Sequence, residues 1–156
     1  MATELDRTES RASIAGHPIH PMLVPFPIAF LVGAFACDIL FSSIGDAFWA
    51  RAALWLAGAG LVMGALAAIF GLVDFLAIRR VRQLHDGWIH FLGNAAALLL
   101  TLWSVLHRWD DAAAGVLPLG IILSGLVTVI LVVTGWYGGE LAYRHRIGVI
   151  GAYPRE

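Results

Sequence analysis

Side chains that can bind a metal ion or a haem are spread through an otherwise apolar chain of 156 residues. Imidazole nitrogens and carboxylate oxygens are common protein ligands of zinc and iron, and imidazole also serves as an axial ligand of haem iron. A neighbouring amide can orient such a ligand by hydrogen bonding. The candidate residues for these roles are His17, His20, Asp74, His90, Asn94, Glu140 and His145.

The composition indicates the environment in which these residues lie. Hydrophobic residues make up 60% of the chain and charged residues only 13%, whereas a soluble domain usually has about 25% charged residues. A chain with so few charges is typical of a protein that contacts the lipid bilayer. The formal net charge of −1 provides no basic surplus for phosphates, which argues against nucleic acid as a partner.

Four segments are long and apolar enough to cross a hydrocarbon core, which takes roughly 20 residues per helix. The short connections between them make consecutive helices antiparallel neighbours. We therefore predict an all-α transmembrane bundle of four helices in up-down-up-down order, over residues 17–149 between polar tails at 1–16 and 150–156. No internal repeat is evident. The predicted spans are Met22 to Ile44, Ala52 to Ile78, Trp88 to Trp109, and Val116 to Tyr137 with an extension as far as Tyr143.

The arginines predict the orientation of this bundle. Eight of the ten basic residues lie in the two tails and the connection between the second and third spans, and only Arg51 and Arg108 lie at the other end. Positive residues are retained on the cytoplasmic side. Both termini are therefore expected to be cytoplasmic.

On this topology, the candidate ligands gather at the cytoplasmic face, because every span delivers polar residues to that end. Ionisable residues inside a span are costly and commonly mark a functional site. In the third span, a 4-3-4 spacing places polar residues on one helix face, which we expect to face the bundle interior. These residues are His90, Asn94 and Thr101, with Ala97 between them.

The segment Gly16 to Pro27 is rich in proline, and it precedes or opens the first span. Residues before proline avoid the helical region, and proline interrupts a helix interior. Regular helix is therefore expected to begin no earlier than about Met22, after irregular backbone from His17 to Pro21.

A second polar set lies towards the opposite face. Asp38 lies inside the first span, and we expect it to form a structural ion pair with Arg51 or His107.

Several of these stretches together resemble the bacterial membrane-protein family known as domain of unknown function 2231. The resemblance covers about residues 16 to 149 and implies a multi-pass protein of the bacterial plasma (inner) membrane. Some relatives carry a Rieske iron–sulfur domain, which implies membrane redox chemistry. The family pattern often has histidine where this chain has Pro25. The matching stretches are Gly16 to Val24, Phe26 to Ile28, Gly71 to Asp74, His90 with Asn94, and Gly138 to His145.

Four functional hypotheses remain open. The first is a haem b protein that transfers electrons to a redox partner, with His20 and His90 as the best candidates for axial ligands, His145 as the third, and Asn94 also at the cofactor site. The second is a zinc or iron site, with or without enzymatic activity, drawn from His17, His20, Asp74, His90 and Glu140. The third is an accessory subunit of a membrane complex, or of an assembly of several copies, whose polar groups only tie helix ends together. The fourth is a proton or solute pathway.

The topology is testable with reporter fusions at both tails and at each connection between spans. A cytoplasmic reporter should be active at both tails and between the second and third spans, because those segments carry the arginine excess. A C-terminal tail on the opposite side of the membrane would contradict the assignment.

Overall fold

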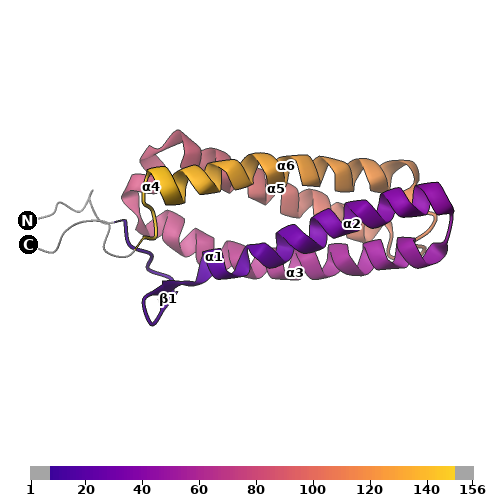
Figure 1. The fold of residues 1–156 in the computed structure, drawn as a ribbon, viewed down its shortest axis with the longest axis horizontal. Helices are drawn as coiled ribbons and strands as arrows, with labels where there is room; N and C mark the ends of the chain where they lie inside the picture. The colour runs from indigo at the N-terminus through magenta and orange to yellow at the C-terminus, as the bar shows by residue number, and fades with distance from the viewer. Residues whose placement is uncertain (1–7, 150–156) are drawn as a thin grey trace, which may run out of the picture.

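The computed structural model describes residues 8–149, in which four long helices lie side by side (Figure 1). These are α2 (Pro25–Ile44), α3 (Ala47–Ala77), α5 (His85–His107) and α6 (Ile121–Gly139). Each of the four spans, Ile19–Ile44, Ala47–Ala77, His85–His107 and Val116–Arg144, is long and apolar enough to cross a membrane. The predicted all-helical fold with four candidate membrane spans is confirmed.

Short elements complete the ends of the bundle. A two-stranded antiparallel hairpin, β1 (Ser13–Ile14) and β2 (His17–Pro18), leads into α1 (Ile19–Leu23). The short helix α4 (Arg79–Gln83) joins α3 to α5. Two short segments flank α6: η2 (Val116–Gly120), which is kinked by extended backbone at Leu117, precedes it, and the π-helical turn η3 (Glu140–Arg144) follows it.

The first span begins earlier than the prolines predict. Backbone is extended at β2, but helix α1 starts at Ile19 rather than at Met22, so the expected start is wrong by three residues. The reason is the position of Pro21, which lies in the first turn of α1, where a helix does not need its missing N–H. Pro25 in turn opens α2, directly after a break at Val24.

Small residues let the helices approach closely. A Cβ atom added at Gly60 would lie 2.5 Å from Leu31 Cδ2, and one added at Gly64 would lie 2.6 Å from Leu98 Cδ2. A stripe of small residues on α3 therefore packs against neighbouring helices over Ala57, Gly60 and Gly64, which are all buried. Large apolar side chains such as Trp55 remain exposed on the outside, as expected of a surface that faces lipid.

A buried ion pair crosses one end of the bundle, which we call the arginine end. The Arg108 guanidinium donates to both carboxylate oxygens of Asp38, at 2.6 and 2.8 Å. Further bonds complete the network: Ser124 Oγ donates to Asp38, and Arg108 donates to Ser104 Oγ and to the Gly120 carbonyl. Asp38 and Arg108 are both 0% exposed.

The expected partners of Asp38 were therefore wrong, since Arg51 and His107 are exposed and Arg108 takes their place. Arg108 stands just after the last residue of α5, at the end of the predicted third span, Trp88 to Trp109. Its long side chain turns back into the bundle. Breaking such a buried pair costs roughly 3–5 kcal/mol, so the pair fixes how α2, α5 and α6 pack.

Candidate functional site

The opposite end of the bundle, which we call the histidine end, brings two of the predicted ligands together. His20 on α1 and His90 on α5 are both half-buried, with ring centroids 6.0 Å apart and planes at 88°. Two side chains 70 residues apart in sequence thus meet edge to face inside the bundle.

Each of these imidazoles is held by the same kind of hydrogen bond. His20 Nδ1 lies 2.8 Å from the Ala67 carbonyl oxygen, and His90 Nδ1 lies 2.8 Å from the Thr134 carbonyl oxygen. Because a carbonyl oxygen can only accept, Nδ1 must carry the proton in both rings. In a neutral imidazole this leaves Nε2 unprotonated, with a lone pair available for a ligand.

Two glycines make room for the rings. A Cβ atom at Gly71 would lie 2.8 Å from His20 Nδ1, and one at Gly138 would lie 2.9 Å from His90 Cε1. Any larger residue at either position would displace the imidazole ring and break its hydrogen bond to the carbonyl oxygen. These glycines belong to two of the stretches that carry the family resemblance.

Asn94 supports His90 from one turn further along α5. Its Nδ2 donates to the His90 carbonyl oxygen at 2.7 Å, and its Oδ1 accepts from Thr134 Oγ1 at 3.3 Å. Ala97 and Thr101, which continue this face of α5, are 1% and 2% exposed. The expectation that this stripe faces the bundle interior is confirmed.

Asp74 does not join the histidines, because its carboxylate is occupied by the N-terminal segment. It accepts bonds from Ser10 Oγ at 2.7 Å and from the backbone amides of Arg11 at 2.7 Å and Ala12 at 3.1 Å. Residues 8–16, assigned from sequence to a polar tail, thus pack against the end of α3.

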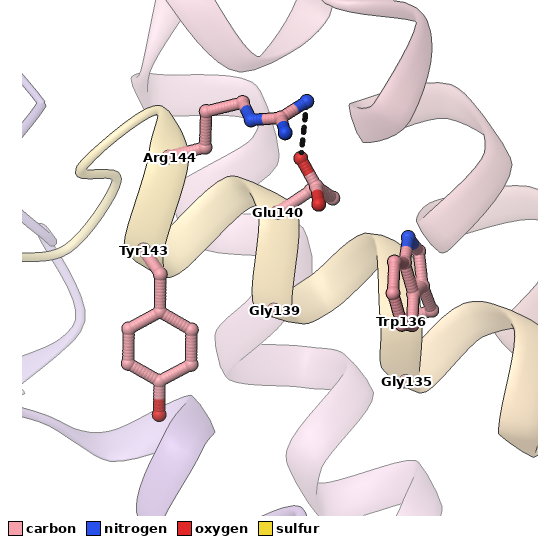
Figure 2. A pocket seen from close by; sticks show the side chains of 6 residues that line it. All are labelled: Gly135, Trp136, Gly139, Glu140, Tyr143 and Arg144. Carbon is pink, nitrogen blue, oxygen red and sulfur yellow. Dashed lines mark ion pairs between the residues drawn. The ribbon is translucent and has the colours of Figure 1, made fainter.

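Glu140 also lies apart from the histidine pair. Its carboxylate pairs with Arg144 at 3.0 Å on the outside of the bundle, in an open groove that Trp136 and Tyr143 also line (Figure 2). The spacing of four residues along one helix makes Arg144 the nearer partner.

The remaining two candidates also have other neighbours. His145 Nε2 lies 2.9 Å from Asp86, and exposed His17 bonds through Nδ1 to the Ala15 carbonyl oxygen. Over residues 8–149, no three His, Cys, Asp or Glu side chains come together in a way that could hold a metal ion. Of the predicted ligands, only His20 and His90 meet.

Sequence reasoning missed several residues that build this end. The carbonyls of Ala67 and Thr134 carry no side-chain signal, and Ser10 lies in a segment that composition assigns to a tail. Gly138 lies in one of the stretches that carry the family resemblance, so a structural role for it could have been expected. That it makes room for His90 could not have been predicted from the sequence.

The fold and the site define a polytopic helical membrane protein with an inward-facing histidine pair at one end. It belongs to the family described as "Predicted membrane protein (DUF2231)", which matches residues 16–151. No curated protein and no solved structure matches the chain.

The contact between Asp74 and the N-terminal segment is testable by hydrogen exchange. Asp74→Ala removes the acceptor of three bonds, two of them from the amides of Arg11 and Ala12. A hydrogen bond to a charged group contributes about 1.5–3 kcal/mol, so exchange at these two amides should accelerate about tenfold or more.

A matched control is Asp86→Ala at the same end of the bundle, where the carboxylate pairs with His145 instead. This control should leave both amides protected. Unchanged protection of Arg11 and Ala12 in Asp74→Ala would contradict the assigned role.

Proposed function

We propose that the protein binds one metal centre between His20 and His90 and acts as a membrane redox or electron-transfer component. The observation that supports this is the pair of imidazoles held as Nδ1–H tautomers, with ring centroids 6.0 Å apart. Metal-binding histidines typically donate their other ring N–H to a carbonyl or carboxylate, as both rings do here.

The separation of the rings suits a shared metal ion. A metal–nitrogen bond is roughly 2.0–2.1 Å, and a ring nitrogen lies roughly 1.1 Å from its ring centre. Two imidazoles on opposite sides of one ion therefore have centroids about 6.3 Å apart. The observed separation is 6.0 Å, and because the rings meet edge to face, they would have to turn for both Nε2 atoms to face one ion.

The donor set favours haem b over a bare zinc or iron ion. Zinc sites use three or four protein ligands, and no third His, Cys, Asp or Glu joins the pair within the described part of the chain. Haem iron needs only two axial ligands, and helical bundles commonly supply them from facing helices. A bound haem would supply one-electron chemistry, while the protein would orient it and shield it from water.

The alternative is an accessory or structural subunit whose polar groups only join helix ends. One observation favours it: among residues 8–149, Thr8 Oγ1 is the one buried side-chain polar atom without a partner. A polar network that is nearly satisfied needs no ligand, and such bonds in membranes contribute roughly 0.6–2 kcal/mol each.

Absorption spectroscopy and metal analysis of the purified protein distinguish the two functions. A metal centre predicts a haem spectrum, or about one equivalent of bound iron or zinc, in the unmodified protein. His20→Ala and His90→Ala should each abolish that signal, because each removes one of two ligands.

His85→Ala and His107→Ala are matched controls, since both histidines are exposed and lie on the same helix as His90. They should retain the full signal. A colourless, metal-free protein from cells supplied with haem precursors and metals would contradict the metal centre and leave the accessory role.

A further inference from the structure

We infer that the bundle consists of two equivalent helix hairpins related by a pseudo-twofold axis, and that the histidine pair is a two-fold symmetric site on that axis. The first hairpin spans residues 19–77 and the second spans 85–144. The equivalence rests on contacts throughout the bundle, and only its consequence for the ligand rests on the proposed function.

The first evidence is a three-part unit that occurs once in each hairpin. A histidine near the start of the first helix donates from Nδ1 to a carbonyl of the second helix, and a glycine four residues after that carbonyl makes room for the ring. Both Nδ1–oxygen distances are 2.8 Å. The units are His20, Ala67 and Gly71, and His90, Thr134 and Gly138.

The second evidence is that equivalent residues touch each other at both ends of the bundle. His20 contacts His90 at the histidine end, and Asp38 contacts Arg108 at the arginine end. The same offset of 70 residues separates the members of each pair. A residue can contact its own symmetry equivalent only near the axis, as in an isologous dimer.

The third evidence is the register of the buried faces. A stripe of buried residues on one helix face is common in bundles. Here, however, the buried positions lie at the same distances along the chain from the histidine, or from the carbonyl that it bonds, in both hairpins. In the first helices, Pro27, Leu31, Ala34 and Asp38 correspond to Ala97, Thr101, Ser104 and Arg108, which are all buried. In the second helices, with an offset of 67, Ala53, Ala57, Gly60 and Gly64 correspond to Gly120, Ser124, Val127 and Leu131, which are also all buried.

The packing of the four long helices has the same symmetry. Helix α2 packs against α3 and α6, and α5 packs against α6 and α3. Exchanging α2 with α5 and α3 with α6 leaves this set of contacts unchanged. Because both hairpins start at the same end, the axis runs along the bundle, as in membrane proteins built from parallel repeats.

The chemistry at the axis explains why the repeat is hidden in the sequence. Two aspartates, or two arginines, at positions 38 and 108 would bring like charges into contact without water. The buried pair therefore requires different residues at equivalent positions. The offset also falls from 70 to 67 across the second hairpin, because the chain from Arg108 to Gly120 is three residues shorter than the chain from Asp38 to Ala53.

The axis defines what the histidine pair can bind. It passes between two equivalent imidazoles, so a ligand there would be bound by one imidazole from each hairpin. His20 and His90 would thus hold a single centre per chain, and a haem bound there would supply one-electron chemistry.

A charge exchange in the full-length protein tests the equivalence. Asp38→Arg and Arg108→Asp alone each leave like charges buried together, and each should lower the Tm in detergent by on the order of 10 °C. If the positions are equivalent, the double variant Asp38→Arg/Arg108→Asp restores the pair with the helices exchanged, and it should recover at least half of that loss.

The control for this exchange is Asp38→Arg/His107→Asp, which supplies the same compensating charge on the exposed face of the same helix. The Tm of this control variant should stay as low as that of Asp38→Arg alone. Equal Tm values for the two double variants, or no recovery in Asp38→Arg/Arg108→Asp, would overturn the equivalence.

The glycines provide an independent arm of the same experiment. Gly71→Ala and Gly138→Ala should lower the Tm by similar amounts, and they should weaken any haem or metal signal equally. Gly58→Ala and Gly135→Ala are controls, because a Cβ at either position meets no atom within 4 Å. An effect at only one of Gly71 and Gly138 would overturn the symmetric site. The Tm values report on the repeat even if no metal binds, so failure of the proposed function remains separable.

Discussion

The absence of water in a bilayer core is the constraint on which this structure depends. A polar atom there must find its partner within the protein, and in this bundle those partners come from other helices. At the arginine end, one carboxylate, one guanidinium and two hydroxyls satisfy one another and a carbonyl, so that three spans are tied together. At the histidine end, two imidazoles reach backbone carbonyls that are accessible because glycines lie one turn further along.

The two ends satisfy their polar atoms in different ways, and this difference supports the site proposed at the histidine end. The Asp38–Arg108 pair is fully buried and has bonds on both carboxylate oxygens, which is what a structural cross-link requires. His20 and His90 at the other end each use only Nδ1 for their structural bond. In each of these two rings, Nε2 is left with its lone pair. A bundle that is cross-linked by an ion pair at one end, and has two imidazole nitrogens with unused lone pairs at the other, is well suited to hold a cofactor.

Much of the fold was predictable from local sequence, but the choice of partners was not. Hydropathy and helical periodicity located the four spans and the inward face of Asn94, Ala97 and Thr101, because both signals lie within a single helix. The partners of Asp38 and Asp74 depend on how helices pack and on a segment that composition assigns to a tail. Arg108 was expected only at the end of its span, because the reach of its side chain back to Asp38 leaves no signal in the sequence. The repeat was hidden for a related reason: equivalent positions on an axis carry complementary residues rather than identical ones.

The most direct measurement is the tautomer of the two histidines, observed by nitrogen NMR of protein labelled with ¹⁵N-histidine and prepared without a bound ligand. Hydrogen bonds to the carbonyls of Ala67 and Thr134 predict that the imidazoles of His20 and His90 are protonated at Nδ1 and unprotonated at Nε2. His20→Ala and His90→Ala should each remove one of these signals. Protonation at Nε2 in either ring would contradict the account, because no lone pair would then face a ligand.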